Sequence, residues 1–544
     1  MASDPGSSDV QLVQQVGEAL REHHAERAAR LAEAALERGI RHPLLFMARG
    51  LWLTEQKRHA DALTQFQAAQ EISEPTAPLE NALGLCLAQL GRYEEAVDAF
   101  DLAISLQPAS AQFHYRKGWV LELAENLNLA WEAHQQAIAL KPDYADALGR
   151  LAFLAARRGA MPEAEAYAKR ALATAPTQTP AQLASAMAEL ERRDYGPASV
   201  RLNALIDDKR VQGTDRFIAY GLLGDLSDRL DRTEEAFTYY GLANQVAATM
   251  RPAARAGGPT MLGLVQGLID TMENIDTVPQ SGEAPAEALG GAAGHAFIIG
   301  FPRSGTTLLE QMLACHGGIV TLEEKDTLIE ALRAFIPESG DLTRLWSADA
   351  GVIAFHRRRY WERVRGFGAD PMGKFFIDKT PINTIYLPLL MRLFPDAKFL
   401  FALRDPRDVV LSCFRRRFTV NPLTSEFLTL ESTARFYDAV MHLFGLYRAK
   451  LSPPLYRVQH EALVGHFDGE AARICEFLGL PFDGAMREFA QRSATRGVAT
   501  PSSTQLVRGL NSEAIGQWRR YADRLAPVLP VLQPWAARFG YPPD

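Results

Sequence analysis

The sequence predicts two different folds in one chain of 544 residues: an array of helix pairs, followed by an α/β domain with a central parallel sheet. Alanines recur at a fixed spacing over much of the first half of the chain. From His295 onward, short apolar runs alternate with helical patterns, which is typical of a parallel sheet with helices on both faces. One run leads into a glycine loop and an apolar helix, an arrangement that holds phosphate groups.

The alanine spacing in the first half is 34 residues and is kept without slippage at Ala28, Ala62, Ala96, Ala130, Ala164 and Ala198. A second set follows seven residues after the first five of these, at Ala35, Ala69, Ala103, Ala137 and Ala171. Small residues of this kind are needed where two helices cross closely. The spacing therefore predicts helix pairs that pack in series.

Other residues keep the same period. Glycines stand twelve residues before three of the alanines, and phenylalanines stand four residues after two of them: Gly50, Gly84, Gly118, Phe66 and Phe100. An aromatic ring can fill the gap beside a small residue, and a proline ends the second helix of a unit. Prolines close three units, at Pro108, Pro142 and Pro176. A period of 34 residues is that of the tetratricopeptide repeat, and an alanine-rich solenoid of other geometry is the alternative.

One more unit follows after a four-residue slip, in "GLLGDLSDRLDRTEEAFTYYGLANQ", with Gly224, Ala236, Tyr240 and Ala243 in the pattern. We expect a disordered N-terminus over residues 1–9 and about seven units over residues 10–250. Such arrays present a concave surface that holds an extended peptide, or they serve as a rigid dimerisation arm. The sequence does not choose between these two uses, so a peptide partner and a homodimer both stay open.

Residues 251–294 differ from the array. "PTMLGLVQGLIDTMENI" can form one amphipathic helix, and "DTVPQSGEAPAEALGGAAG" is a linker rich in Pro, Gly and Ala. We place the start of the second domain near His295 and its extent at residues 295–544. Its strand candidates are "AFIIG", "KFFIDKT", "AKFLFALR" and "PLYRVQH".

Composition excludes some classes of function. Hydrophobic residues make up 47% and charged residues 23%, and the net charge of −7 is spread along the chain, so nucleic acid is not expected as a partner. "MASDPGSSDVQLVQQ" lacks the features of a signal peptide, and we find no apolar run of the ~18 residues that a membrane span needs. We expect a cytoplasmic location. The cysteines lack metal-binding spacing and are expected to be buried free thiols: Cys86, Cys315, Cys413 and Cys475.

The glycine loop lies in "HAFIIGFPRSGTTLLEQML". Gly305 lets the backbone approach an anion, and the N–H groups of the first helical turn then point at that anion. Arg303 supplies a permanent charge, and Ser304, Thr306 and Thr307 supply hydroxyl groups. A Walker A loop would carry lysine where Thr306 stands, so a triphosphate would be poorly held. A single 5′-phosphate that bears another group fits this loop better.

A second candidate site for phosphate lies in "LRDPRDVVLSCFRRRF". Asp405 followed by Pro406 predicts that a helix starts directly after Arg404. Ser412 falls about two turns into that helix, ~10 Å along its axis. An arginine at a strand end and a serine on the next helix can hold a second, separate phosphate, although an ordinary helix start would show the same pattern.

Two further strand ends carry candidate catalytic groups. Lys379, in "IDKTP", could donate to a departing oxygen, or it could be a surface lysine. Glu323 and Glu324, in "CHGGIVTLEEKDTL", return to the same edge of the sheet. One of them could be the general base for an acceptor hydroxyl, or the pair could be solvated and cap the next helix. "FHRRRY" and "FRRRF" could attract an acidic acceptor or form solvated helix faces.

Three segments together resemble the sulfotransferases: "FPRSGTTLLEQML", "LRDPRDVVLS" and "QLVRGLNSEAIGQWRRY". The resemblance is strongest to the tyrosylprotein branch and its bacterial tetratricopeptide-fused relatives, and it covers residues 295–525. It implies 3′-phosphoadenosine 5′-phosphosulfate (PAPS) as donor and adenosine 3′,5′-bisphosphate as product, without a metal. By this resemblance the 5′-phosphosulfate falls to Arg303, Ser304, Gly305, Thr306 and Thr307, and the 3′-phosphate to Arg404 and Ser412.

The same resemblance assigns the chemistry. Glu324 takes the place of the general base, Lys379 that of the catalytic lysine, and Arg303 helps to stabilise charge on the departing oxygen. Arg508 takes the place of a basic residue that closes over the 3′-phosphate, with Ser502 or Ser503 as a contributor.

Two positions depart from the branch. Asp326 stands where the branch has an arginine that helps with acidic peptides, and His460-Glu461 stands where it has Tyr-Glu. Both departures are expected to affect the acceptor rather than the donor. A peptide hydroxyl, tyrosine above all, is the favoured acceptor, while a glycan, a lipid and a small metabolite stay open. A P-loop kinase or ATPase with "FFID" as its Walker B strand, and a binding module with a non-catalytic nucleotide domain, are the alternative functions.

Overall fold

The computed structural model describes residues 5–250, 260–275, 289–491 and 514–543. The chain divides into two compact units, Met1–Arg193 and Asp194–Asp544. The first consists of helices in the described residues, and the second combines further helices with a parallel sheet. These are the α-helical repeats and the α/β domain that the sequence predicts.

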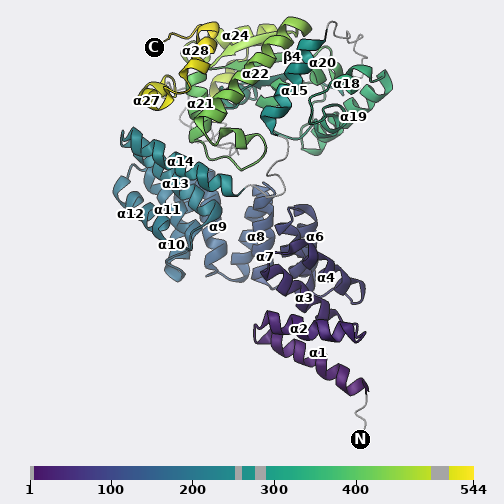
Figure 1. Cartoon of the computed structure of the whole chain (residues 1–544). Helices are drawn as coiled ribbons and strands as arrows, with labels where there is room; N and C mark the ends of the chain where they lie inside the picture. The colour runs from purple at the N-terminus through teal and green to yellow at the C-terminus, as the bar shows by residue number, and fades with distance from the viewer. Residues whose placement is uncertain (1–4, 251–259, 276–288, 492–513, 544) are drawn as a thin grey trace. The chain divides into compact units, whose positions relative to one another are not determined.

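The first unit is built from antiparallel helix pairs that follow one another along the chain (Figure 1). Its helices are α1 (Pro5–Arg21), α2 (Ala25–Glu37), α3 (Pro43–Glu55), α4 (His59–Glu71), α5 (Ala77–Gln89), α6 (Tyr93–Leu106), α7 (Ala111–Leu123), α8 (Leu127–Leu140), α9 (Ala145–Arg157), α10 (Met161–Thr174) and α11 (Thr179–Glu191).

The periodic small residues explain how the helices of a pair approach each other. The alanines of the 34-residue pattern in this unit are fully buried. A Cβ atom added to Gly84 would lie only 2.8 Å from the ring of Phe100, and one added to Gly50 would lie 2.4 Å from the ring of Phe66. Beside Gly118 the aromatic position is taken by His134, which the sequence pattern did not identify. Each glycine therefore makes room for a ring from the second helix.

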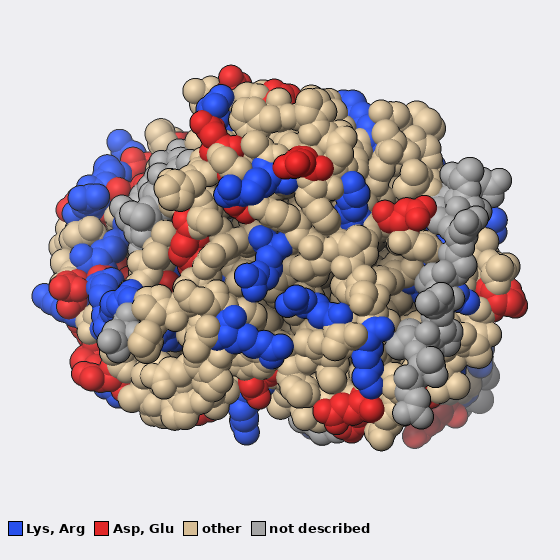
Figure 2. All heavy atoms as spheres, turned by 90° about the horizontal axis from the view of Figure 1, so that it is seen from above, with Lys and Arg blue, Asp and Glu red and all other residues tan. Residues whose placement is uncertain are grey.

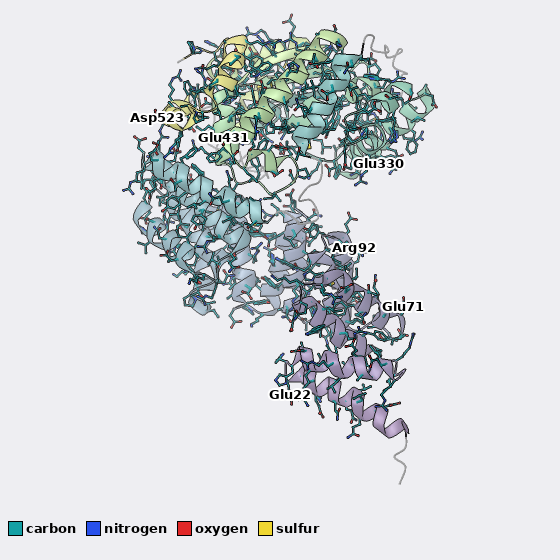
Figure 3. The ribbon with its side chains drawn as sticks, viewed as in Figure 1. Glu22, Glu71, Arg92, Glu330, Glu431 and Asp523 are labelled. Carbon is teal, nitrogen blue, oxygen red and sulfur yellow. The ribbon has the colours of Figure 1, made fainter. Side chains whose placement is uncertain are left out.

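Charged side chains cover the outside of the repeats. Figure 3 labels Glu22, Glu71 and Arg92, which are exposed and point away from the helix pairs. Arg92 forms an ion pair with Glu95 on the next helical turn, 2.5 Å between nitrogen and oxygen. The sides of the helices that meet a neighbour are apolar, as amphipathic packing requires, and charged residues lie on the outside.

The second unit opens with helices α12 (Tyr195–Asp207), α13 (Gly213–Arg229), α14 (Thr233–Thr249) and α15 (Met261–Asn274). Its strands are β1 (Gly294–Gly300), β2 (Ile319–Glu323), β3 (Phe375–Lys379), β4 (Lys398–Leu403) and β5 (Leu455–Gln459). They form one parallel sheet in the order β2-β3-β1-β4-β5. In the register, Ile298 of β1 lies opposite Lys379 and Leu400.

The other elements of this unit connect and cover the strands. Its α-helices are α16 (Thr306–Leu313), α17 (Ile329–Phe335), α18 (Thr343–Ser347), α19 (Ala350–Gly366), α20 (Leu387–Leu393), α21 (Pro406–Arg415), α22 (Leu430–Leu451), α23 (His460–Gly465), α24 (Phe467–Leu478), α27 (Ala522–Leu525) and α28 (Leu529–Phe539). Short 3₁₀ helices occupy Pro381–Tyr386, Thr424–Phe427, Gly484–Glu488 and Gln517–Tyr521.

Four of the strands are those the sequence predicts, and β2 is an addition. Its sequence, "IVTLE", is short, lies at the edge of the sheet, and is fully buried only at Ile319 and Leu322. A half-exposed edge strand of five residues carries a weak apolar signal, and for this reason the sequence pattern missed it.

Apolar residues of β1 alternate between the two faces of the sheet, as the period of a strand requires. Phe297 and Ile299 enter one core, together with residues of α15, α19, α20, α21, α22 and α28. Ala296 and Ile298 enter the other, together with residues of α16 and α24. Helices thus cover both faces of the sheet.

Helix α15 contributes to this domain although it precedes His295. Its residues Val265, Leu268 and Met272 are buried in the first of the two cores. Lys450 of α22 donates to the carbonyl oxygens of Met272, at 2.5 Å, and of Ile275, at 2.9 Å. In the parts of the chain that the structure describes, no helix has the length and apolar character to cross a membrane.

The glycine contacts give a prediction about stability. Gly84→Ala should lower the melting temperature, because the new Cβ would lie 2.8 Å from the Phe100 ring. Overpacking typically costs 1–3 kcal/mol, against a gain of about 1 kcal/mol in helix propensity, so we expect a net loss of about 1 kcal/mol. Gly241→Ala is the matched control, since its Cβ would meet no atom within 4 Å. Thermal unfolding followed by circular dichroism should show a stabilised Gly241→Ala; equal shifts in both variants would contradict the packing account.

Candidate functional site

The loop after β1 has the backbone of an anion site. Thr384 fixes its start: the Gly300 N–H donates to Thr384 Oγ1 at 2.7 Å, and that hydroxyl donates to the Gly300 carbonyl at 2.8 Å. Gly305 has a φ of 93° and directly precedes α16. Since glycine has no side chain to cap the helix, the first N–H groups of α16 remain available to a ligand. Thr306, with 3% of its surface exposed, occupies the place of a Walker lysine.

Backbone strain gathers at two predicted site residues. Among the described residues after 289, a positive φ at a residue other than glycine occurs at Arg303 (70°), Glu324 (45°) and Ser452 (48°). A left-handed conformation at such a residue costs about 1–3 kcal/mol and persists where the surroundings impose it, often at functional sites. Arg303 and Glu324 are the residues to which the sequence assigns phosphate binding and proton abstraction.

The two predicted phosphate-binding groups lie in direct contact. Arg303 Nε donates to Ser412 Oγ at 3.1 Å, and an Arg404 Nη1–H donates to the Arg303 carbonyl at 3.2 Å. As the sequence predicts, Asp405 caps α21, since its side chain accepts from the Arg407 N–H at 2.9 Å. The structure therefore brings Arg303, Arg404 and Ser412 together at the carboxyl ends of β1 and β4.

These residues form a buried cluster of positive charge. Burial lowers the pKa of Arg303, and the neighbouring Arg416 and Arg404 lower it further. Burial, together with Arg404 and Arg303, lowers the pKa of His460 to about 3, so its ring is neutral near pH 7. Burial is the larger cause of both shifts, and repulsion between neighbouring cations adds to it. A bound anion would reverse them.

Two buried nitrogen atoms in this cluster also lack a hydrogen-bond partner in the part of the chain that the structure describes. Arg404 Nε and His460 Nδ1 have no hydrogen-bond partner among the described residues. A Cβ atom at Gly305 would lie 2.6 Å from His460 Nδ1, so only glycine fits here without displacing the ring. Buried polar groups are nearly always paired, and guanidinium groups suit phosphate oxygens. The residues present therefore fit a phosphate-bearing ligand.

His460 is a correction to the sequence analysis. There it was expected to affect the acceptor, whereas the structure places it against Gly305 and beside Arg303 and Arg404. The sequence position of His460 could have indicated this placement. His460 directly follows β5, at the edge of the sheet where the other site residues lie. Glu461 accepts from the Asp405 N–H at 3.2 Å and from the Tyr541 hydroxyl at 2.8 Å, so it also belongs to this side of the site.

The predicted acid–base residues meet on β2 and β3. Lys379 is fully buried, and its Nζ donates to Glu324 Oε1 at 2.6 Å and to Glu323 Oε1 at 2.9 Å. Burial alone would lower the pKa of Lys379, but the Glu324 and Glu323 carboxylates outweigh it and the pKa is raised. Lys379 is therefore no surface lysine, and the glutamates bind it rather than cap a helix. The Glu324 side chain is 47% exposed and that of Glu323 is 21% exposed.

A buried network under Lys379 holds the loop that carries Glu324. Asp378 accepts from the Thr327 hydroxyl at 2.8 Å and from the Tyr360 hydroxyl at 3.0 Å. The Glu324 N–H donates to the Lys379 carbonyl at 2.8 Å. Burial raises the pKa of Asp378 to about 6. Sequence patterns did not indicate this network, because Thr327, Tyr360 and Asp378 lie far apart in the chain.

Within the two arginine runs, Arg358 is exposed, but Arg357 is buried and Arg415 and Arg417 are paired with acidic side chains. In "FRRRF", Arg415 pairs with Asp228 at 2.5 Å and Arg417 pairs with Asp225 at 2.8 Å. In "FHRRRY", Arg357 is buried and donates to the Leu393 carbonyl at 2.6 Å. Both interpretations of these runs from the sequence were therefore wrong for Arg357, Arg415 and Arg417.

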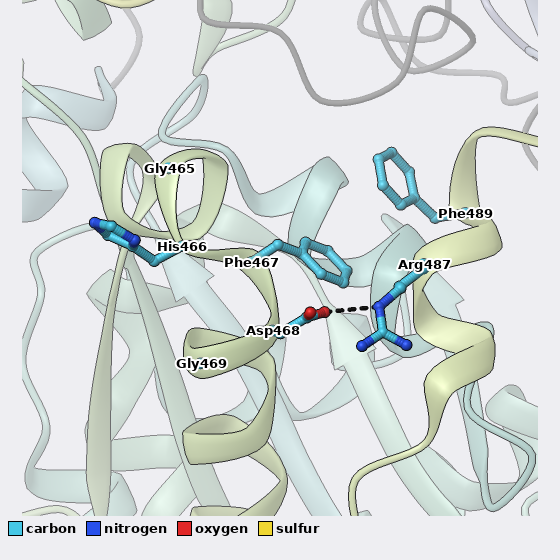
Figure 4. Close-up of a pocket in the computed structure, with 7 residues that line it drawn as sticks. All are labelled: Gly465, His466, Phe467, Asp468, Gly469, Arg487 and Phe489. Atoms are coloured by element: carbon cyan, nitrogen blue, oxygen red, sulfur yellow. Dashed lines mark hydrogen bonds and ion pairs between the residues drawn. The ribbon is translucent and has the colours of Figure 1, made fainter.

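Other features of the chain do not belong to the site around Arg303 and Lys379 as the structure describes it. Ser502, Ser503 and Arg508 lie outside the described residues. A surface pocket, lined by Gly465, His466, Phe467, Asp468, Gly469, Arg487 and Phe489, contains none of the predicted site residues (Figure 4). The four cysteines are buried and free. Within the described ranges, no group of three or more His, Cys, Asp or Glu residues could hold a metal ion.

Surface charge is mixed. Seen from above, lysine and arginine side chains lie around a hollow near the middle of the face, and acidic side chains are scattered between and outside them (Figure 2). This distribution agrees with a small net charge of −7. Glu330 of α17, labelled in Figure 3, pairs with Arg359 of α19 at 2.8 Å.

Comparison with known proteins agrees with this geometry. Residues 296–484 match the model of the sulfotransferase family, and residues 15–78 and 77–110 match models of the tetratricopeptide repeat. The second half of the chain is thus similar to the sulfotransferase family, and parts of the first half are similar to the tetratricopeptide repeat.

Its relatives include proteins named as sulfotransferases. The chain is 24% identical to protein-tyrosine sulfotransferase A of Caenorhabditis elegans over 46% of this chain and 67% of that protein. It is 27% identical to protein-tyrosine sulfotransferase 1 of Danio rerio over 45% of this chain and 72% of that protein. It is also 27% identical to a protein of Aquifex aeolicus, over 44% of this chain but only 32% of that protein.

Two solved structures are also similar. A tetratricopeptide repeat protein from Parabacteroides merdae is 16% identical, with a TM-score of 0.36, over 44% of this chain and 93% of that one. MamA is 20% identical, with a TM-score of 0.28, over 30% of this chain and 95% of that one.

The raised pKa of Asp378 gives a prediction about pH. The native carboxyl binds a proton more readily than the unfolded one, with a pKa of about 6 against 3.8. The contribution of Asp378 to the free energy of unfolding therefore rises by up to about 3 kcal/mol as the pH falls from about 6 to about 4. Asp378→Asn should lack this gain. Urea unfolding of both proteins between pH 4 and 7 gives the contribution of Asp378 as the difference between their free energies of unfolding. If both free energies change in parallel with pH, the assignment to Asp378 is wrong.

Proposed function

We propose that the α/β domain transfers a sulfuryl group from PAPS to a hydroxyl acceptor. The observation that carries this proposal is the buried pair of cations Arg303 and Arg404, with the neutral His460 beside them, at the start of α16, and with Thr306 where an NTPase has lysine. Such a cluster suits phosphates that are held singly rather than as a triphosphate. The family match and the names of the relatives support the same reaction.

The donor would be held by two groups of residues. The 5′-phosphosulfate would be held by the loop residues Arg303, Ser304, Gly305, Thr306 and Thr307, whose N–H and hydroxyl groups surround the start of α16. The 3′-phosphate would be held by Arg404 and Ser412. Ser502 and Arg508, which lie outside the described residues, are proposed to complete this second group.

The reaction would be an in-line displacement at sulfur. A bond forms between the acceptor oxygen and sulfur, and the bond from sulfur to the bridging phosphate oxygen breaks, which leaves adenosine 3′,5′-bisphosphate. Glu324 takes the proton of the acceptor hydroxyl. Lys379 and Arg303 stabilise the negative charge on the bridging oxygen. These cations suffice for a monoanionic sulfuryl group, so no metal is invoked.

Glu324 is a better candidate for the base than Glu323. Both carboxylates lie within 3 Å of Lys379 Nζ, but Glu324 is the more exposed of the two. Its φ of 45° and its backbone bond to the Lys379 carbonyl fix its position at the end of β3. An acceptor hydroxyl that enters from solvent can therefore reach Glu324 while Lys379 stays buried behind it.

The acceptor we propose is a peptide hydroxyl, that of tyrosine above all, since the relatives that carry a functional name are protein-tyrosine sulfotransferases. Asp326 departs from the arginine of that branch, although the Arg363 guanidinium lies beside it and donates to the Asp326 carbonyl at 2.7 Å. The tetratricopeptide groove would hold the acceptor chain, or the repeats would serve a homodimer. Transfer of labelled sulfate into a host lysate, followed by identification of the product, decides among peptide, glycan, lipid and metabolite.

Glu324→Gln should lower turnover about 10²- to 10⁴-fold, because a positioned general base contributes that factor. Its affinity for adenosine 3′,5′-bisphosphate should stay nearly unchanged, since the nucleotide is held on the other side of the site. Glu323→Gln is the matched control and should lose far less turnover. Initial rates of sulfate incorporation and calorimetric titration measure the two quantities. Equal losses in both variants, or a parallel loss of affinity, would refute the choice of Glu324.

A second prediction separates this reaction from that of a P-loop kinase or ATPase. Adenosine 3′,5′-bisphosphate at about 100 times its dissociation constant should stabilise the protein by about 2.7 kcal/mol without magnesium. This corresponds to a rise in melting temperature of roughly 5–11 °C for a domain of this size. ATP with magnesium should give a smaller shift, because Thr306 replaces the lysine that neutralises a polyphosphate. The opposite order in a thermal melt would favour the kinase or ATPase.

A further inference from the structure

The carboxyl end of α21 is bound by the last pair of repeat helices, α13 and α14. Arg415 at the end of α21 pairs with Asp228 of α13 at 2.5 Å, and Arg417 pairs with Asp225 of α13 at 2.8 Å. Asn244 of α14 donates to the Phe414 carbonyl at 3.0 Å in a buried position. The helix that carries Ser412 thus ends in contacts with a repeat, within the same compact unit.

These ion pairs are largely shielded from solvent. The Arg415 and Asp228 side chains are 16% and 13% exposed. The Arg415 guanidinium also lies over the ring of Tyr240, 5.3 Å from its centre, and the Tyr240 hydroxyl donates to Asp225 at 3.1 Å. A buried ion pair loses several kcal/mol when one partner is removed, because the other charge is left uncompensated. The position of the end of α21 is therefore strongly determined by the two aspartates.

The same charges reach the donor-binding loop. Arg416 lies between the two paired arginines in sequence, and its charge lowers the pKa of Arg303, as does that of Arg404. Asp225 in turn is influenced by Arg417, Arg416 and Arg415, which together hold its pKa below the ordinary value against the effect of burial. Asp225 and Asp228 are thus anions of the repeat that offset cations next to the proposed phosphate site.

Geometry gives a second connection. Ser412, which accepts from Arg303 Nε at 3.1 Å, stands three residues before Arg415, so both lie on neighbouring turns of α21. A shift or rotation of the end of α21 would displace Ser412 from Arg303. The contact with the repeat and the contact with the phosphate loop therefore belong to one short helix of ten residues.

We propose that Asp225 and Asp228 of the last repeat are positioning residues for donor binding: they fix the end of α21 and thereby the Ser412–Arg303 pair that receives the donor. The inference rests on the proposed function for the identity of the ligand. It makes helices α13 and α14 a working part of the transferase domain, in addition to any role of the repeats in binding a partner.

The test compares the full-length protein with Asp225→Asn and Asp228→Asn by calorimetric titration of adenosine 3′,5′-bisphosphate. Coupling through a packed network typically amounts to 0.5–2 kcal/mol, so the dissociation constant should rise roughly 2- to 30-fold in each variant. The KM for PAPS should rise by a similar factor while kcat changes little, because Glu324 directly follows β2 and Lys379 ends β3, so neither lies on α21.

Glu234→Gln provides the matched control. Glu234 of α14 pairs with Arg524 of α27, which also joins the repeat to the domain, but the two side chains are 65% and 45% exposed and neither lies on α21. Its removal should leave the dissociation constant unchanged. A loss of affinity equal to that of the aspartate variants would overturn the inference, because any weakening of this interface would then suffice.

Two further readouts separate positioning from simple loss of folding. A destabilised but otherwise normal protein shows a lower fraction of binding sites in the titration with an unchanged dissociation constant, and that result would overturn the inference. Asp225→Glu, which keeps the charge, should recover most of the affinity. If Asp225→Asn does not fold, Tyr240→Phe removes only the hydroxyl that donates to Asp225 and should weaken binding by a smaller factor; unchanged affinity there and in Asp228→Asn refutes the proposal.

The proposed function fails in a different way. If the unaltered protein does not bind adenosine 3′,5′-bisphosphate, the donor assignment is wrong whatever the variants do. If the unaltered protein binds and the two aspartate variants bind equally well, the donor assignment stands and the role of the repeat is refuted.

Discussion

The site depends on one electrostatic constraint: several cations must stay close together at the carboxyl edge of the sheet. Arg303 and Arg404 are close together there: Arg404 adds to the lowering of the Arg303 pKa by burial, and both arginines add to the lowering of the His460 pKa. Asp408 compensates the charge of Arg404 only from a distance of 3.8 Å. Its two oxygens accept hydrogen bonds from the N–H groups of Gly516 and Trp518. The surroundings of Arg303 and Arg404 therefore keep a positive charge, which an anion site requires.

The order of the strands in the sheet separates Arg404 and His460 from the acid–base groups. The chain places β1 in the centre, with β3 and β2 on one side and β4 and β5 on the other. Lys379, Glu323 and Glu324 therefore gather on one side of β1, while Arg404 and His460 gather on the other. A ligand at the end of β1 has phosphate-binding cations on one flank and a carboxylate on the other, as expected where strand order reverses in an open sheet. Glu324 pairs with Lys379, at 2.6 Å, on the flank away from Arg404 and His460.

Sequence patterns predicted the features that depend on local backbone. The glycine loop, the Asp-Pro helix start and the 34-residue period each follow from neighbouring residues, and the sheet with four of its strands followed from them. Contacts between distant segments were not accessible in this way: Arg417 and Asp225 are 192 positions apart, and Tyr360 and Asp378 belong to different elements. His460 was assigned to the acceptor because its neighbours in space, Gly305 and Arg404, are not its neighbours in sequence.

The absence of a loop lysine follows from the same constraint. An NTPase lysine neutralises a polyphosphate, whose several charges exceed what the backbone can offset. Here the charges of Arg404 and Arg416 already act on Arg303, and Thr306 next to this loop is almost wholly buried. An ammonium group at that position would add a charge to a cluster whose members already repel, with no polyphosphate to balance it. Threonine keeps the hydroxyl and the N–H while it leaves the net charge matched to phosphates held one at a time.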